Sequence, residues 1–179
     1  RRVTMQSLDP KDLAKHYIEA TRETVSALSG QPKVLGLIAS KDEPSLAYAR
    51  ATQQRFLETG MAYELKRVKR LDLEAAIEAA NLDPSIHGIF IYFPIFGNQQ
   101  DAYLRNLVHF SKDVEAGSQY WTQKLYANER YARIGDVLKK AVLPCTPLAV
   151  VKLLLELDVY AKAGPSNTQP LVGKTVTIF

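Results

Sequence analysis

Apolar residues follow two different rhythms along the first half of the chain. Short runs rich in branched and aliphatic residues cover 33–40, 61–68 and 88–93, and each has the length of a strand. The run at 88–93 is almost continuously apolar, which is typical of a strand that is buried on both faces. We therefore expect three strands, with the last of them in the interior.

Before and between these runs, apolar residues recur every three or four positions, which is the spacing of an amphipathic helix. This spacing predicts a first helix that starts at Asp9 and is stopped by Gly30, and further helices at 44–59 and 72–81. Asp9 stands in the N-cap position of the first helix and Pro10 at its first helical position, and a glycine follows each of the first two helices.

The predicted order is a helix followed by strand, helix, strand, helix and strand. Strands that alternate with helices favour a parallel sheet, because each connection must cross over one face of the sheet. The fold class is therefore α/β. We expect a three-layer α/β/α domain with a mainly parallel sheet.

The pattern becomes less regular after Pro94. Residues 101–110 look helical, and 111–133 read as a loop-rich stretch with several tyrosines. A strong helix is predicted at 147–160, with Thr146 as its cap.

The composition changes near residue 160. We expect 1–160 to form a first domain, 161–170 a linker and 171–179 the first strand of a truncated Rossmann-type domain. A lone strand cannot bury itself, so most of that second domain would follow Phe179.

The overall composition is that of a globular protein, with 179 residues, 46% hydrophobic and 23% charged. The single cysteine cannot form an internal disulfide, and no apolar run approaches the ~20 residues that span a bilayer. We expect a cytoplasmic protein with no membrane partner.

The net charge is +4, and the densest basic stretch is 66–70. Asp72 and Glu74 follow it at once, which favours a solvated face over a nucleic-acid surface. We expect no nucleic-acid partner.

The common motifs of nucleotide binding, serine hydrolysis and metal binding are absent from the sequence. The glycines never form G-x-G-x-x-G or G-x-x-x-x-G-K-[ST], so these residues contain no phosphate-binding loop of either kind, and no G-x-S-x-G elbow exists. His16, His87 and His109 lack ligand spacing with each other or with Cys145, so no metal site is predicted.

Two features lie near the predicted sheet. Tyr48 and Thr52 are four residues apart and share one helix face. Tyr92 and Pro94 end the buried strand at its carboxyl edge, where open α/β sheets bind ligands. The alternatives are a tyrosine that packs in the core and an ordinary strand end.

Two further features follow later in the chain. Asp113 and Glu115 place two acids in one loop, and Cys145 stands directly before a predicted helix. A helix dipole could lower the pKa of that thiol. The alternatives are a solvated loop and a small buried cysteine.

Taken in order, five segments resemble the methylenetetrahydrofolate dehydrogenase/cyclohydrolase family over nearly the whole chain. They are SLAYARAT, GIFIYFPIFGNQQD, SKDVE, LPCTPLAVVKLL and LVGKTVTIF. Within the family the resemblance is closer to the fungal monofunctional, NAD-dependent members, because of IYFPIFGNQQD and Thr52.

The resemblance implies oxidation of 5,10-methylenetetrahydrofolate to its 5,10-methenyl form, with NAD as the cofactor of the full-length enzyme. Bifunctional members carry Tyr-x-x-x-Lys, and their lysine serves as acid and base in the cyclohydrolase step. Here Thr52 follows Tyr48 at that spacing, and its hydroxyl does not titrate near neutrality. Dehydrogenase activity without cyclohydrolase activity is implied.

The resemblance also implies roles for individual side chains. Tyr48 would stack along the folate, and Glu115 would accept hydrogen bonds from the donor edge of the pterin. Cys145 would line the cleft near the reacting carbon, with Tyr48 and Thr52 as the other catalytic candidates. The remaining substrate-binding candidates are Tyr92, Pro94 and Pro147, of which the first two would shape the floor of the pocket.

The family motif has a glycine directly after the acid at position 115, whereas this chain has Ala116. If that position adopts a positive φ, alanine costs energy and could displace the loop. The resemblance further implies a homodimer, a tetrahydrofolate substrate and cofactor-binding residues beyond Phe179. We expect these 179 residues to bind folate without producing NADH.

Three alternatives stay open. One is a bifunctional, NADP-dependent dehydrogenase/cyclohydrolase, and another is nucleic-acid binding through the basic stretch. The third is a non-catalytic α/β ligand-binding or interaction domain, in which the loop tyrosines and Trp121 form a partner surface.

Overall fold

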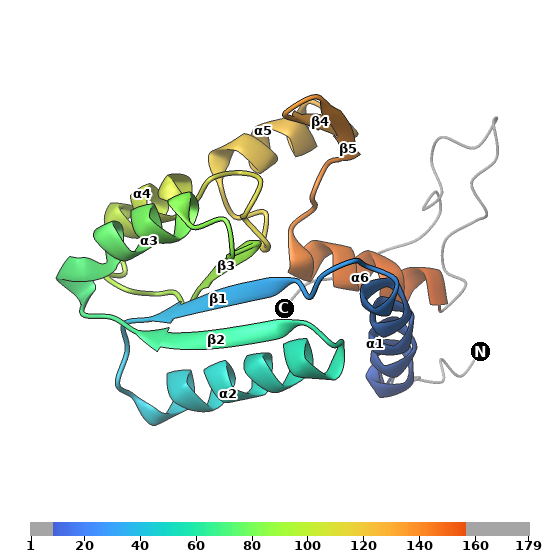
Figure 1. Cartoon of the computed structure of the whole chain (residues 1–179), viewed down its shortest axis with the longest axis horizontal. Helices are drawn as coiled ribbons and strands as arrows, with labels where there is room; N and C mark the ends of the chain where they lie inside the picture. Colours follow the sequence, from blue (N-terminus) through green and yellow to red (C-terminus); the bar gives the residue numbers. More distant parts are fainter. Residues whose placement is uncertain (1–8, 157–179) are drawn as a thin grey trace, which may run out of the picture.

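The computed structural model describes residues 9–156 (Figure 1). The predicted linker at 161–170 and the predicted strand at 171–179 lie outside the described residues. The domain boundaries therefore stay a prediction.

A parallel three-stranded sheet forms the centre of the fold. Its strands are β1 (Lys33–Ile38), β2 (Ala62–Arg67) and β3 (Gly88–Ile91), in the spatial order β2-β1-β3. The three predicted strands and their parallel arrangement are confirmed. Because β1 lies between the other two, its backbone is hydrogen-bonded along both edges.

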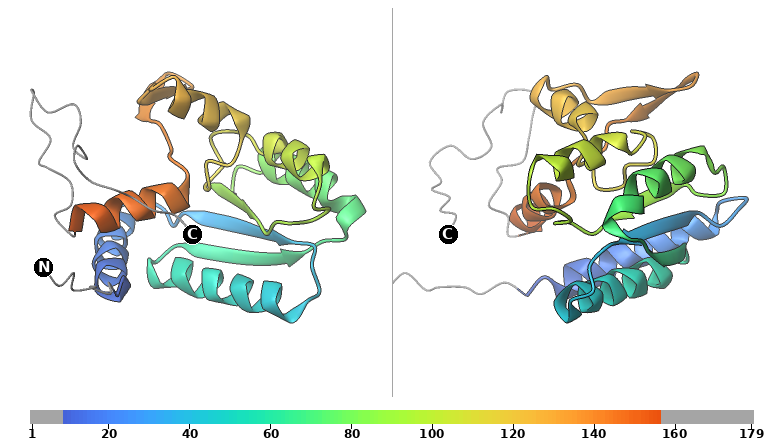
Figure 2. Two further views of the ribbon diagram at one scale, coloured as in Figure 1. Left: turned by 180° about the vertical axis from the view of Figure 1, so that it is seen from behind. Right: turned by 90° about the vertical axis from the view of Figure 1, so that its left-hand side faces the viewer.

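Helices cover both faces of the sheet. Figure 1 shows α2 (Glu43–Glu58) below it and α3 (Leu73–Leu82) and α4 (Gln99–Leu107) above it. The views in Figure 2 show the same three layers. The α/β class and the α/β/α layering are thus confirmed.

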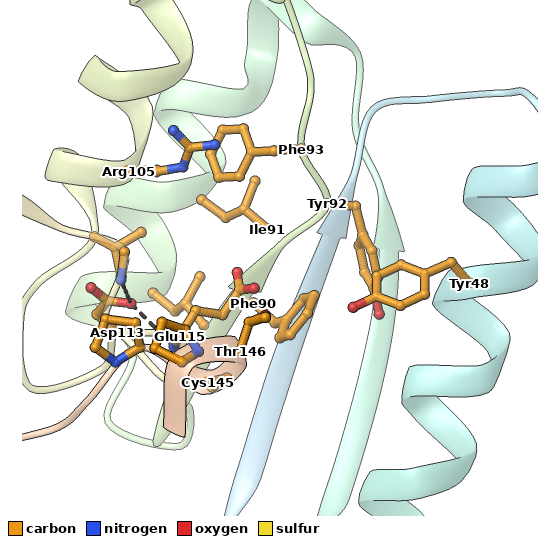
Figure 3. A pocket seen from close by; sticks show the side chains of 15 residues that line it. Tyr48, Phe90, Ile91, Tyr92, Phe93, Arg105, Asp113, Glu115, Cys145 and Thr146 are labelled. Atoms are coloured by element: carbon orange, nitrogen blue, oxygen red, sulfur yellow. Dashed lines mark hydrogen bonds between the residues drawn. The ribbon is translucent and has the colours of Figure 1, made fainter. Parts of the chain in front are cut away.

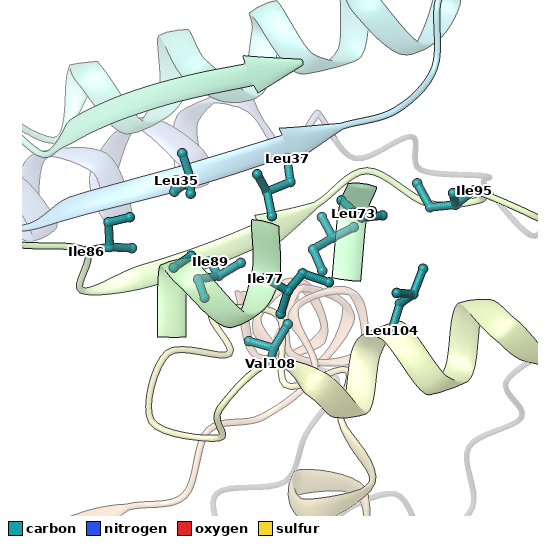
Figure 4. Packing of buried hydrophobic residues seen from close by; sticks show 11 residues of the cluster. Leu35, Leu37, Leu73, Ile77, Ile86, Ile89, Ile95, Leu104 and Val108 are labelled. Atoms are coloured by element: carbon teal, nitrogen blue, oxygen red, sulfur yellow. The ribbon is translucent and has the colours of Figure 1, made fainter. Parts of the chain in front are cut away.

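Alternation along the strands divides the core into two clusters. Leu35 and Leu37 face α3 and α4, where they pack with Ile77 in an aliphatic cluster (Figure 4). Val34 and Ile38 point to the opposite face, toward α2. This division follows from the two-residue repeat of a strand, which sends successive side chains to opposite faces.

The first helix, α1 (Lys11–Ser26), begins close to the predicted residue. The backbone N–H of Lys11 donates to Asp9 Oδ1 at 3.0 Å, so Asp9 does satisfy a donor of the first turn. The prediction of Asp9 as the N-cap is nevertheless wrong by one residue, because Pro10 takes the N-cap position and Lys11 is the first helical residue.

The prediction of a loop-rich stretch at 111–133 is wrong in part. This stretch contains α5 (Gln119–Tyr126) and β4 (Tyr131–Ile134), which pairs antiparallel with β5 (Val137–Lys140). The helix is fixed by Trp121, which is buried and donates through its indole N–H to the Phe110 carbonyl at 2.9 Å. A helix held by one such anchor has too few apolar positions to give a helical repeat in the sequence.

The last described helix, α6 (Cys145–Glu156), begins before the predicted start. Thr146 is therefore not its cap but lies in its first turn, together with Pro147. Proline is tolerated there because the N–H groups of a first turn have no partner within the helix. This earlier start includes Cys145 in the helix.

Candidate functional site

A cavity of about 320 Å³ lies alongside β3, at the edge of the sheet (Figure 3). Five parts of the chain enclose it: α2, β3 with the residues after it, the carboxyl half of α4, the loop at 113–117, and the amino end of α6. Its lining residues include the following ones used below: Tyr48, Tyr92, Phe93, Arg105, Asp113, Glu115, Cys145 and Pro147.

One side of the cavity is aromatic. Tyr48 of α2 meets Tyr92 edge to face, with ring centroids 5.8 Å apart and an interplanar angle of 85° (Figure 3). Tyr92 is only 5% exposed, whereas Tyr48 is 60% exposed. The exposed ring is therefore free to contact a ligand while the buried ring supports it.

The opposite side is acidic, and Asp113 organises it. Its buried carboxylate accepts backbone N–H groups of Glu115 at 3.2 Å, Gly117 at 3.3 Å and Ser118 at 2.9 Å. A carboxylate that accepts several backbone donors fixes the path of a loop. Asp113 therefore holds the loop that presents Glu115 to the cavity.

Ala116 does adopt the left-handed conformation that its position predicts, with φ +52°. Alanine is strained there, since this region favours glycine. The loop nevertheless keeps its three bonds to Asp113, and Glu115 lines the cavity. The substitution at this position costs energy but does not turn Glu115 away.

Glu115 has an unusual electrostatic environment. Burial and the neighbouring Asp113 carboxylate raise the pKa of Glu115 to about 7, against the opposing effect of the Arg105 guanidinium. This carboxyl group therefore changes its charge near neutral pH. Ionised, it accepts hydrogen bonds only, and protonated, it can also donate one.

Cys145 stands at the first position of α6, and its Sγ lies 3.6 Å from the carbonyl oxygen of Val114. Burial raises the pKa of the Cys145 thiol, and the Glu115 and Asp113 carboxylates raise it further. The possible lowering of this pKa by the helix dipole is therefore not found. Since thiolates are the reactive form, Cys145 is a neutral lining group and not an activated nucleophile.

Sequence reasoning missed two basic residues. Arg105 lines the cavity, and its guanidinium stacks 4.2 Å from the centre of the Phe93 ring (Figure 3). Lys112 donates to the carbonyls of Ala80 at 2.9 Å and Asp83 at 2.7 Å, so it caps the carboxyl end of α3. Lys112 lies within the SKDVE segment and Arg105 in no motif, and the contacts of both with distant segments could not be read from the sequence.

Two predicted site residues do not line the cavity. The Thr52 hydroxyl donates to the backbone carbonyl of Tyr48 at 2.9 Å, which is a bond within α2. Pro94 is exposed and follows the cavity-lining Phe93. The structure brings together Tyr48, Tyr92, Glu115, Cys145 and Pro147, whose roles stay predictions.

Two of the three histidines make hydrogen bonds within the fold. His87 Nδ1 accepts the backbone N–H of Lys33 at 3.1 Å, and His109 Nδ1 lies 2.8 Å from the Ser111 hydroxyl. Within residues 9–156, no group of three or more His, Cys, Asp or Glu side chains is arranged to hold a metal ion. None of the helices in this part of the chain combines the length and apolar character needed to cross a membrane.

Comparison with known proteins identifies a family and several relatives. Residues 8–115 match the family described as the catalytic domain of tetrahydrofolate dehydrogenase/cyclohydrolase. The chain is 40% identical over 166 residues to the methylenetetrahydrofolate dehydrogenase [NAD(+)] of Schizosaccharomyces pombe, covering 93% of this chain and 51% of that protein. It is 42% identical over 149 residues to the Saccharomyces cerevisiae protein of the same name, covering 83% and 46%.

Solved structures give the same result. The NAD-dependent 5,10-methylenetetrahydrofolate dehydrogenase of Saccharomyces cerevisiae superposes with a TM-score of 0.81 at 37% identity, covering 91% of this chain and 53% of that one. A silkworm 5,10-methylenetetrahydrofolate dehydrogenase gives 0.76 at 19% identity, covering 87% of this chain and 53% of the silkworm chain, which shows the shared fold alone. The chain spans about half the length of the curated relatives it matches.

Proposed function

Since this chain belongs to the tetrahydrofolate dehydrogenase/cyclohydrolase family, we propose that its cavity binds the folate substrate of an NAD-dependent dehydrogenase. The whole protein would oxidise 5,10-methylenetetrahydrofolate to 5,10-methenyltetrahydrofolate. The observation that carries this proposal is that a single cavity holds an exposed aromatic ring, Tyr48, and a titratable acid, Glu115, on opposite sides.

The chemistry suits such a cavity. When a hydride leaves the methylene carbon of this substrate, the two adjacent nitrogens stabilise the cation that remains. The protein mainly has to hold that carbon in a defined position, and acid–base catalysis has little part. Burial raises the pKa of the Tyr92 phenol and of the Cys145 thiol, so both stay neutral and shape the cavity.

Substrate recognition is assigned to the two opposing groups. The exposed ring of Tyr48 offers an apolar face for stacking on a flat heterocycle or an aromatic ring. The ionised carboxylate of Glu115 offers acceptors for the N–H donors of a pterin. Together they would fix both the plane and the edge of the substrate.

NAD is proposed as the hydride acceptor because the named fungal relatives are NAD-dependent. No G-x-G-x-x-G loop occurs in these 179 residues, so we assign none of them to holding NAD. NAD supplies the capacity to accept a hydride, and the residues described here supply binding and orientation of the folate.

Cyclohydrolase activity is not part of the proposal. The Thr52 hydroxyl is hydrogen-bonded within α2 and has no pKa near neutrality with which to activate water. Relatives named bifunctional protein FolD are more distant, at 29% identity for the Acholeplasma laidlawii protein, with 96% of this chain and 56% of that protein covered. Hydrolysis of methenyltetrahydrofolate by the whole protein would contradict this assignment. The homodimer and the cytoplasmic location stay predictions.

Calorimetric titration with 5-formyltetrahydrofolate, a stable reduced folate, tests the proposed site. We expect the 179-residue chain to bind it, and Tyr48→Ala to weaken binding about tenfold, because loss of aromatic stacking costs about 1–3 kcal/mol. The matched control is Tyr131→Ala, since Tyr131 is similarly exposed on β4 and does not line the cavity. Unaltered binding by Tyr48→Ala, or an equal loss in Tyr131→Ala, would contradict the proposal.

A further inference from the structure

Two buried tyrosines meet across the width of the sheet. Tyr63 lies on β2 and Tyr92 directly follows β3, with β1 between them. Their hydroxyl oxygens are nevertheless only 2.5 Å apart. Both side chains are less than a tenth exposed, so water does not compete for this bond.

Gly36 makes this contact possible. It lies on β1 between the two strands, on the face toward α2, and a Cβ at this position would clash with the Tyr63 hydroxyl oxygen. The same Cβ would lie 2.7 Å from Cζ of the Tyr63 ring. Only glycine therefore lets the Tyr63 ring extend over β1 and reach Tyr92.

The Tyr92 hydroxyl has two contacts. It lies 2.5 Å from the Tyr63 hydroxyl, a bond in which either oxygen can donate. It also lies 3.4 Å from the backbone carbonyl of Ala49, which can accept its proton. This chain of two bonds connects β2 to the end of β3 and from there to α2.

The connection ends beside the cavity. Ala49 is the neighbour of Tyr48 in α2, and the Tyr48 ring itself packs edge to face on Tyr92. Phe56 stacks on the far side at 5.0 Å from the Tyr63 ring centre, and Phe90 lies 4.9 Å from that of Tyr92. Tyr63 does not line the cavity but is held firmly behind the residues that do.

We propose that Tyr63 is a positioning residue of the folate site. Its hydroxyl passes over Gly36, where no side chain blocks it, and fixes the Tyr92 ring, and Tyr92 in turn fixes Tyr48. This inference rests on the proposed function, because it assigns Tyr63 a part in folate binding. Tyr63 acts through Tyr92 and does not touch the substrate.

The electrostatics fit a positioning role. Burial and the bond to Tyr92 raise the pKa of Tyr63 far above its ordinary value, and burial also raises the pKa of Tyr92. Both phenols therefore stay protonated at neutral pH. The bond between them is therefore constant, and removing it should leave the pH dependence of binding unchanged.

Tyr63→Phe tests this role, because it removes one hydroxyl and leaves the ring. We expect the dissociation constant for 5-formyltetrahydrofolate to rise about fivefold, which corresponds to the loss of one neutral hydrogen bond. The matched control is Tyr103→Phe. The Tyr103 hydroxyl donates to Glu74 at 2.6 Å, and neither residue lines the cavity. The affinity of this variant for 5-formyltetrahydrofolate should change less than twofold. A purely structural role for Tyr63 would lower the melting temperature and leave the affinity unchanged.

A double variant shows whether the loss of affinity in Tyr63→Phe depends on the Tyr48 ring. In Tyr48→Ala, the added change Tyr63→Phe should alter affinity less than twofold, since the ring that it positions is gone. A full fivefold loss in that background would overturn the inference. If Tyr63→Phe does not fold, Tyr92→Phe removes the other partner of the same bond together with the contact to Ala49, and a loss of at least fivefold in affinity is expected.

A folate-free measurement separates this inference from the proposed function. The ring resonances of Tyr48, observed by NMR with labelled tyrosine, should shift in Tyr63→Phe because the Tyr92 ring moves against them. A shift in a chain that binds no 5-formyltetrahydrofolate would reject the proposed function alone. Unshifted resonances with unaltered affinity, in a chain that does bind it, would reject the positioning role alone.

Discussion

The two faces of the central sheet are built from different kinds of side chain. The face toward α3 and α4 is aliphatic, with Leu37, Leu73 and Ile77 fully buried. The face toward α2 carries aromatic rings, among them Tyr63 and Tyr92, whose hydroxyl groups are hydrogen-bonded. Both clusters reach the cavity, the aliphatic one through Ile89, Ile91 and Val108 and the aromatic one through Phe90 and Tyr92. Only the aromatic face carries the hydrogen bond between buried hydroxyls.

The two faces therefore contribute differently to stability and to the positioning of side chains. Aliphatic contacts have no preferred direction, so they stabilise the fold without fixing any one side chain to high accuracy. A hydrogen bond between buried hydroxyls fixes both distance and direction. We therefore expect changes on the aliphatic face to alter stability, and changes on the aromatic face to alter binding as well.

Ile77→Ala should give the largest loss of stability. Ile77 is 0% exposed at the centre of the aliphatic cluster, and truncation to alanine at such a site typically costs about 2–4 kcal/mol. Urea unfolding would measure the loss. At temperatures where the variant is still folded, its affinity for 5-formyltetrahydrofolate should equal that of the unaltered chain, and a large fall in affinity would remove the distinction between the faces.

Gly36→Ala should have an intermediate effect on stability. The added methyl group pushes against the Tyr63 ring, and overpacking of a buried site costs roughly 1–3 kcal/mol. Unlike Ile77→Ala, it should also weaken folate binding in the folded variant. Gly30→Ala is the matched control, because a Cβ at Gly30 meets nothing within 4 Å and should leave both quantities unchanged.

Glu115→Gln should have the smallest effect, visible as a change in pH dependence. The folded-state pKa of Glu115 is raised, so its contribution to stability is present below about pH 4.5 and is lost as pH rises through about 7. We expect roughly 1–2 kcal/mol of this loss between pH 5 and pH 8, reduced by partial solvent exposure, and none of it in the variant.

Urea unfolding at the two pH values measures that difference, with Glu19→Gln on the exposed side of α1 as the control. Folate binding by the unaltered chain should change in the opposite sense and strengthen as pH rises through 7, because the ionised carboxylate is the better acceptor. If the free energy of unfolding depends on pH equally in the unaltered chain and in Glu115→Gln, burial does not raise the pKa of this carboxyl group.

Much of the fold could be predicted because it depends on local periodicity. The apolar runs at β1, β2 and β3 and the helical repeats between them are readable in the sequence, and they imply a parallel sheet. The helix α5 and the hairpin of β4 and β5 could not be predicted, since Trp121 and its distant contact with Phe110 fix the helix.

The candidate site divides in the same way. Tyr48, Glu115 and Cys145 were identified from motifs that resemble a known family, and the structure brings all three to one cavity. Arg105 was missed because it reaches the cavity from the middle of α4 and contacts Phe93 only through the folded structure. Spacing along a chain does not reveal such an approach.

The sequence by itself determined the α/β class, the alternation that divides the core into two faces, and the family to which the chain belongs. These properties follow from residues that are near one another in the chain, or from short motifs and the order in which they occur. Only the tertiary structure decided that burial raises the pKa of Glu115 and Cys145, and that Tyr63 reaches Tyr92 over Gly36. Burial and contact between distant strands are properties of packing, so they exist only once the chain has folded.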